Sequence, residues 1–422
     1  MSILSQKLQS HPLIKILVDL RGNERACIYT EPLWGIPYNL YIPFFTVYQH
    51  ALGVSDRQIG ILLSLSMFMQ VITMPLGGLL TDRFGRRRTT FYVDILVWSV
   101  PVLIWAFAQS FTWFLAAMLF NGMWQITSIS WTCLLVEDCD KNKLVPIFTW
   151  ATICGLLAVF FAPLSGLLVS RVGIIPAMRV LLLIAFSLMT AKFIILFIFS
   201  HETNQGRIQM QATRHASPGQ FLSEYRQLAV KMARNPRTWH LLAFLVLFNV
   251  GSTILTNFFA LYATLSLNTP EPYLAYFPIG RAVIMLIFIF TIQTVLNRHS
   301  FKVPMIAGLI IYVLSQLVLL NAPVGRPGFL WLYILGEALA YALVVPQKDS
   351  LIVLFIDPEE RPRQVSLLYL AMTAISTPFG WIAGELSQRS RQWPFLLNMV
   401  LFALCVLLVI RLRPASADKQ EA

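Results

Sequence analysis

The chain has 422 residues, of which 57% are hydrophobic and only 12% are charged. Soluble globular domains carry about 25% charged residues, so this composition excludes an ordinary soluble protein and indicates a membrane protein. The formal charge of +12 would suggest a nucleic-acid partner only if the basic residues formed a solvent-exposed patch.

Residues 1–32 precede the first long apolar run. Their leucines and isoleucines alternate with polar positions, which differs from the continuous apolar core of a secretory signal. This pattern predicts an amphipathic segment at the cytoplasmic surface of the membrane. At the end of this segment, Glu31 is expected to reach the lipid headgroups.

Twelve apolar runs follow, each about long enough to cross a bilayer. They cover about 33–53, 57–79, 90–109, 112–136, 144–169, 174–199, 239–265, 274–296, 304–321, 328–352, 364–386 and 394–412. We therefore predict an all-α membrane protein with two six-helix bundles, at 33–199 and 239–412. A cytoplasmic linker at 200–238 joins the bundles, and a cytoplasmic tail at 413–422 follows them.

The basic residues are distributed unevenly around these runs. If both termini are cytoplasmic, the loops on the other side of the membrane contain only Arg57, Arg171, Arg326, Arg389 and Arg391. Cytoplasmic enrichment of Lys and Arg is the usual determinant of topology. The charge therefore predicts a multi-pass protein of the cell membrane, plasma or inner, whose surroundings are the lipid bilayer. We expect a monomer and no nucleic-acid partner.

The loop after the second run is rich in charge and contains two glycines that suit close packing and a tight turn. Its sequence, GLLTDRFGRRR at 78–88, resembles the signature at this place in the major facilitator superfamily. The matching residues are Gly78, Leu80, Asp82, Arg83, Gly85, Arg86 and Arg87. The resemblance implies the twelve-span fold of that superfamily, with two pseudo-symmetric halves, and solute transport by alternating access.

In that superfamily the loop is a gate. Its aspartate meets the start of span 11, and its arginine meets an acidic group at the inner end of span 4. The resemblance thus implies an inner latch of Asp82, Arg86 and either Glu137 or Asp138, which favours the outward-open state. Asp94, early in the third run, is expected at the same gate. The alternative is that the arginines only set the topology.

Two further patterns follow from the resemblance. The eleventh run presents Ser376, Gly380 and Gly384 at four-residue spacing, a face suited to close helix packing. Because the superfamily packs span 2 against span 11, Gly78 is the expected partner of this face.

The fifth run reads AVFFAPLSGL, which is similar to the antiporter signature of the superfamily at Ala162, Pro163 and Gly166 but departs from it at Leu167. This similarity favours export by antiport. Many proton-coupled members carry an arginine early in span 4, where this chain has Met118, and its absence argues against their standard coupling mechanism.

The linker contains SPGQFLSEYRQLAVKMARNP, whose apolar residues share one helical face before Pro236. It predicts a basic surface helix between the two bundles. The five cysteines are scattered and lie near no histidine at metal-ligand spacing, so we expect no disulfide framework, metal or cofactor.

Ionisable residues inside spans are costly and by default indicate function. Arg281 in the eighth run and Glu337 in the tenth lie roughly 10–14 Å below the outer membrane surface at 1.5 Å per residue. Those spans line the central cavity in the superfamily, so we predict an ion pair between them. The pair could exchange partners with a charged solute, or it could permanently fix the two helices.

Polar and aromatic residues at mid-span depth supply a candidate solute pathway suited to a moderately apolar organic molecule. They are Asn39, Tyr41, Trp124, Gln125, Asn249, Ser252, Asn257 and Tyr341.

Together these features predict a secondary transporter of a small organic solute, an exporter or antiporter coupled to a proton or another cation. One alternative is an importer of the same fold, working as a symporter or uniporter. Others are a transporter-like membrane receptor and a membrane-embedded enzyme. The absence of HExxH and GxSxG motifs argues against an enzyme.

Overall fold

A computed structural model describes residues 12–140, 143–213, 230–291, 302–355 and 361–411. These residues are predominantly helical and include no strand. The helices of the first half are α2 Pro12–Asp19, α3 Gly22–Thr30, α4 Pro32–Tyr41, η1 Ile42–Phe44, α5 Phe45–Ala51, α6 Asp56–Phe84, α7 Arg86–Asp94, η2 Ile95–Ser99, α8 Val100–Ala106, α9 Phe111–Asn121, α10 Trp124–Val136, α11 Leu144–Val159, α12 Ala162–Val172, α13 Ile174–Phe199 and α14 Asn204–Ala212. Those of the second half are α16 Pro236–Leu261, η5 Tyr262–Ser266, η6 Glu271–Ala275, α17 Phe277–Thr291, α19 Lys302–Leu320, α20 Gly328–Phe355, α21 Arg361–Arg389 and α22 Trp393–Arg411.

Ten helical segments within the described ranges are long and apolar enough to cross a membrane. The expected first and fourth spans are not among them, and each is divided in the structure. The first is interrupted by η1, which contains Pro43, a residue with no N–H to donate to a helix. The fourth is interrupted between α9 and α10, at Gly122 and Met123.

The structure describes only part of the segment at 1–32 that the sequence predicts to be amphipathic. Residues 1–11 lie outside the described part of the chain, and α2 is a short helix. Helix α3 is not a surface helix, since it packs against α10, α11 and α13. Cys27 and Ile28 on α3 are 0% and 1% exposed, because this helix leads directly into the first span.

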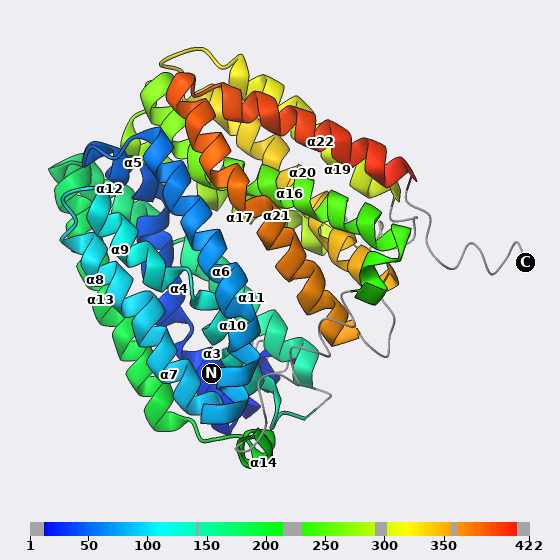
Figure 1. The fold of residues 1–422 in the computed structure, drawn as a ribbon. Helices are drawn as coiled ribbons and strands as arrows, with labels where there is room; N and C mark the ends of the chain where they lie inside the picture. The colour runs from blue at the N-terminus through cyan, green and yellow to red at the C-terminus, as the bar shows by residue number, and fades with distance from the viewer. Residues whose placement is uncertain (1–11, 141–142, 214–229, 292–301, 356–360, 412–422) are drawn as a thin grey trace, which may run out of the picture. The chain divides into compact units, whose positions relative to one another are not determined.

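The chain divides into two compact units, which differ from the two expected bundles in one segment. Unit 1 comprises residues 1–42 and 69–216, and unit 2 comprises residues 43–68 and 217–422. In unit 1, α13 packs against α4 and α8, and α10 packs against α7. In unit 2, α19 packs against α20 and α22, and α16 packs against α21 and α22 (Figure 1).

Residues 43–68 belong to unit 2 because α5 and the first half of α6 pack on its helices. A Cβ added to Gly60 would lie 2.5 Å from the Gly380 carbonyl oxygen and 2.7 Å from the Gly384 Cα. The Ser64 hydroxyl donates a hydrogen bond of 2.6 Å to the Thr377 carbonyl. The small-residue face of α21 therefore receives Gly60.

Within unit 2 this face is occupied by Gly60, whereas Gly78, the expected partner, belongs to unit 1. A Cβ added to Gly78 would meet no heavy atom within 4 Å. The spacing of small residues identified the correct face of α21, but it did not indicate which turn of α6 approaches it.

We expect Gly60→Val to destabilise the protein by about 1–3 kcal/mol, because the added atoms would force α6 and α21 apart. Gly78→Val makes the same chemical change in the same helix without this close approach, and it is the matched control. Thermal unfolding of the purified variants in detergent measures the difference. Equal shifts for the two variants would contradict the assigned contact.

Candidate functional site

The predicted gating loop forms a tight turn between α6 and α7. Gly85 has a φ of +87°, a backbone conformation that side chains other than glycine rarely adopt. A Cβ at this position would also collide with the Glu202 carboxylate. The glycine thus allows α7 to begin at Arg86, with only Gly85 separating it from the end of α6.

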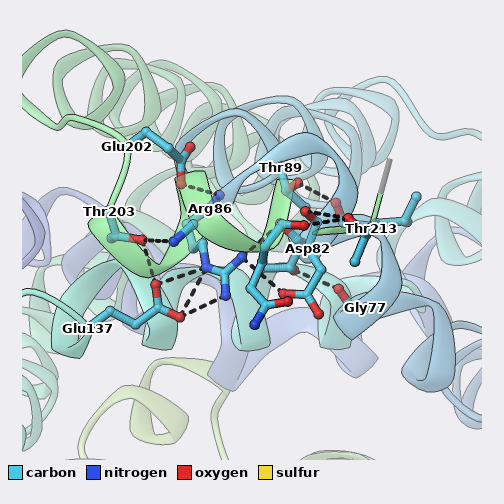
Figure 2. Close-up of polar contacts among 12 residues, drawn as sticks. Gly77, Asp82, Arg86, Thr89, Glu137, Glu202, Thr203 and Thr213 are labelled. Carbon is cyan, nitrogen blue, oxygen red and sulfur yellow. Dashed lines mark hydrogen bonds and ion pairs between the residues drawn. The ribbon is translucent and has the colours of Figure 1, made fainter. Parts of the chain in front are cut away.

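Arg86 is the centre of a buried ion-pair network on this loop (Figure 2). Its Nη1 lies 3.0 Å from Asp82 Oδ1, and its Nη2 lies 2.9 Å from Glu137 Oε1. Its Nε also donates to both Glu137 oxygens, at 3.0 and 2.9 Å. Such multidentate contacts fix the orientation of both groups. Of the two candidate acids, Glu137 is therefore the partner, and Asp138 instead accepts a hydrogen bond from the Asn204 amide.

Glu202 and Thr203, which follow α13, complete this network. The sequence did not indicate them. The Glu202 carboxylate accepts hydrogen bonds from the backbone N–H groups of Arg86 and Arg87, at 2.8 and 3.2 Å. It thereby satisfies donors at the positive N-terminus of α7. Thr203 donates to Glu137 Oε2 at 2.5 Å and accepts from the Gly206 N–H, which caps α14 (Figure 2). We call Asp82, Arg86, Glu137, Glu202 and Thr203 the Arg86 cluster.

The remaining residues of the gating motif lie around this cluster. Arg87 donates from Nε and Nη2 to the Phe197 carbonyl, at 2.9 and 2.6 Å, and its guanidinium covers the Phe197 ring. Arg83 is exposed. Asp94, which we expected at the gate, is buried farther along α7 and accepts a hydrogen bond from Thr127 on α10. Most of the predicted linker helix lies outside the described residues, and the linker helix seen before it is α14.

A second charged cluster joins residues 43–68 to the end of α21 and the turn that follows it, within unit 2. The Asp56 carboxylate is 2% exposed and lies 3.0 Å from Nε of Arg391. Ser387 donates to the same carboxylate at 2.7 Å, and Nε2 of His50 lies 3.9 Å from it. We call these four residues the Asp56 cluster. No motif in the sequence indicated it.

Asp56→Asn is expected to cost about 1.5–3 kcal/mol of stability, because it removes the charge from two buried hydrogen bonds. Glu385→Gln is the matched control, since both partners of Glu385, Arg57 and Arg389, are 57% and 64% exposed and such surface pairs contribute about 0–1 kcal/mol. Thermal unfolding in detergent gives both values. A loss for Glu385→Gln as large as that for Asp56→Asn would contradict a special role for the Asp56 cluster.

The predicted pair of in-span charges is present in unit 2. Nη2 of Arg281 on α17 lies 3.2 Å from Oε1 of Glu337 on α20. The guanidinium carbon of Arg281 is 4.3 Å from the centre of the Tyr341 ring, a cation–π contact. Glu337 is 7% exposed, whereas the Arg281 side chain is 36% exposed. Glu337 therefore pairs with Arg281 from a buried position, while part of the Arg281 side chain stays exposed.

Arg281 and Tyr341 line a cavity of about 460 Å³ in unit 2. The other lining residues are Leu245, Phe248, Asn249, Ser252, Thr256, Met285, Val345, Lys348, Tyr369 and Met372. The cavity thus includes four of the predicted pathway residues, Asn249, Ser252, Arg281 and Tyr341. Thr256 and Tyr369 are polar lining residues that the sequence did not single out, whereas Lys348, a charge near the inner end of the tenth run, was expected to reach the headgroups.

The other pathway residues do not line this cavity. Asn257 donates back to the Thr253 carbonyl one turn earlier, and Asn39 makes the equivalent bond to Gly35. Tyr41 is 1% exposed and packs against the rings of Tyr38 and Trp105.

Trp124 and Gln125 on α10 are partly buried in unit 1. In the antiporter-like stretch, Pro163 stands in the first turn of α12 between buried Ala162 and Gly166, a position that needs no N–H donor.

Glu31 does not reach the headgroups as expected. Its Oε2 lies 2.9 Å from Nζ of Lys192 on α13, and both side chains are largely buried in unit 1. The reason is that α3 continues into the first span, which places Glu31 beside α13.

Comparison with known proteins matches residues 34–335 to the family model of the Major Facilitator Superfamily. Over 130 residues, which are 30% of this chain and 32% of the relative, the chain is 23% identical to the multi-drug resistance efflux pump PmrA of Streptococcus pneumoniae. The match thus spans about a third of that pump.

Solved structures share the fold over most of the chain. The nucleoside transporter NupG is 14% identical, with a TM-score of 0.71 and coverage of 92% of this chain and 98% of that one. A peptide transporter POT in complex with sulfate is 15% identical, with a TM-score of 0.67 and coverage of 95% and 97%. Since the family model matches more than half of the residues, the chain belongs to the Major Facilitator Superfamily and is a multi-pass membrane transporter, not an enzyme.

Proposed function

We propose that this protein exports an amphipathic organic solute with an acidic group, by alternating access in the cell membrane, and that it works as a monomer. The cavity around Arg281 is the solute site in this proposal. Its role is supported by its size, because cavities that bind small organic molecules occupy about 300–1,000 Å³ and combine apolar walls with a few polar groups.

The charge of the cavity lining is the observation that carries the choice of an acidic solute. Arg281 and Lys348 both contribute to the lining, and the lining residues described by the structure include no carboxylate. The partner of each cation, Glu337 for Arg281 and Asp349 for Lys348, lies outside the lining. Two cations facing the cavity favour a solute anion. Phe248, Met285 and Met372 supply apolar surface for the remainder of the molecule.

Export is the direction that two features support. The stretch around Pro163 is similar to the antiporter signature, and 130 residues of the chain are similar to a multi-drug efflux pump. In this proposal the Arg86 cluster is the inner latch and the Asp56 cluster is the outer latch. Asp56 and Arg391 fall in loops that the distribution of basic residues assigns to the outer side.

A thermal-shift screen of the purified protein tests the choice of solute. The library contains amphipathic molecules in matched sets, each with a carboxylate, a neutral amide or an amine on the same apolar body. Ligands that bind only the folded protein raise its melting temperature, so we expect shifts from the carboxylates alone. Shifts confined to the amines would contradict an acidic solute.

Transport of a solute identified in this way tests the direction. In inside-out vesicles, an exporter accumulates the solute when a proton gradient is imposed. Accumulation only in right-side-out vesicles would support the importer, and binding without accumulation in either orientation would support a receptor.

A further inference from the structure

Unit 1 contains a buried group of charges that the proposed solute site does not use. It consists of Glu31 at the end of α3, Asp94 at the end of α7 and Lys192 on α13. The Lys192 side chain is 6% exposed, the Glu31 side chain is 16% exposed, and Asp94 is 4% exposed. We call these three residues the Lys192 cluster.

Lys192 stands at the centre of this cluster. Its Nζ lies 2.9 Å from Oε2 of Glu31, and its charge also interacts with that of Asp94. The aromatic rings of Trp34, Trp131 and Phe193 surround the ammonium group, with centres 5.8 to 5.9 Å from Nζ. Such rings stabilise a cation and exclude water. The ammonium therefore remains charged, and its one direct ion-pair partner in the described structure is Glu31.

Asp94 has a neutral partner for its carboxylate. It accepts a hydrogen bond from the Thr127 hydroxyl, and both residues are buried. Two thiols also lie near the cluster. Cys27 is 0% exposed and interacts electrostatically with all three charged residues, and partly buried Cys154 interacts with Glu31. A buried thiol is neutral near pH 7, so it adds no compensating charge.

The charges of the cluster do not balance. With both carboxylates ionised and one ammonium, the cluster carries one excess negative charge in a buried, water-poor part of a membrane protein. An uncompensated charge in such surroundings costs several kcal/mol, and a buried group usually avoids this cost by changing its protonation state. Binding one proton neutralises the cluster. Protonating Glu31 would break its direct ion pair with Lys192. Protonating Asp94 loses less Coulomb energy, so Asp94 is the group that binds the proton.

We propose that the Lys192 cluster is a proton-binding site, in which Asp94 carries the proton while Glu31 pairs with Lys192. Loss of the proton ionises Asp94, and Lys192 then interacts with two ionised carboxylates, those of Glu31 and Asp94. If the proposed antiport is correct, this exchange supplies the coupling proton without an arginine early in span 4. That last step rests on the proposed function, whereas proton binding by the cluster does not.

Infrared difference spectroscopy during pH titration tests the proton site without any solute. The purified protein is measured in lipid nanodiscs, where a protonated carboxyl group gives a carbonyl stretch that shifts in D₂O. We expect a band that appears as the pH falls, is lost in Asp94→Asn, and persists in the matched control Asp138→Asn. Asp138 is a suitable control because it is an exposed acid outside the cluster.

Three results would overturn the proposal. The first is that the folded parent protein shows no such band. The second is that the band persists in Asp94→Asn. The third is that adding Na⁺ at constant pH removes the band, which would indicate a metal-cation site. If Asp94→Asn does not fold, Asp94→Glu keeps an acid and must move the frequency of the same band. A titrating band in a protein that transports no solute would leave the proton site intact and contradict only the proposed function.

Discussion

Arg86→Gln is expected to destabilise the protein by about 3 kcal/mol. Removing one partner of a buried ion pair leaves the other charge uncompensated, which costs about 3–5 kcal/mol in a fully buried site. Glu137 and Asp82 are 15% and 35% exposed, so the lower end of that range applies. Thermal unfolding of the detergent-solubilised variant measures the loss.

Arg88→Gln is the matched control for this prediction. Arg88 is exposed on the same helix, and substitutions at such positions usually change stability by less than about 0.5 kcal/mol. If both substitutions had the same small effect, the arginines of this loop would act only as a topology signal. A large loss for Arg86→Gln alone would support the Arg86 cluster as a specific structural latch.

Arg281→Met is expected to abolish binding of an acidic solute and to destabilise the protein, because buried Glu337 loses its cation. Adding Glu337→Met removes the uncompensated charge, so the double variant should recover most of the stability. It should not recover binding, since the guanidinium that faces the cavity is still missing. The double-mutant cycle in thermal unfolding separates these two effects.

Solute binding by the stable double variant decides between the two roles of this pair. If the double variant bound the acidic solute as tightly as the parent, Arg281 and Glu337 would only fix α17 against α20. Loss of binding in a stable protein would assign Arg281 to the solute site. Lys348→Met, at the same cavity, is expected to destabilise the protein less than Arg281→Met because Asp349, its partner, is 59% exposed and stays solvated.

The sequence identified the contacts that depend on a local motif. Asp82 and Arg86 are four residues apart in the sequence, and the family pattern placed an acidic partner near Glu137. Glu202 and Thr203 were missed because their partners, the N-terminus of α7 and Glu137, are far away in the sequence. A threonine three residues before Gly206 is an N-cap signal for α14, but it says nothing about Glu137.

Contacts between distant helices were harder to predict. Periodicity gives the face of a helix but not the depth at which another helix crosses it, so Gly78 was expected where Gly60 lies. The same uncertainty placed Glu31 at the headgroups, although α3 carries it to Lys192. The Arg281–Glu337 pair was predicted correctly because two rare charges at similar depth in apolar spans have few other partners.

Alternating access is the central claim, and the accessibility of one cavity residue tests it most directly. Ser252 lines the Arg281 cavity and is replaced by cysteine after Cys27, Cys133, Cys139 and the two other native cysteines have been changed to serine. We predict that a membrane-impermeant thiol reagent labels Ser252→Cys both in right-side-out and in inside-out vesicles. Leu314→Cys, at a 53% exposed apolar position of α19, should remain unlabelled in both because lipid covers it. Labelling of Ser252→Cys from one side only would contradict alternating access.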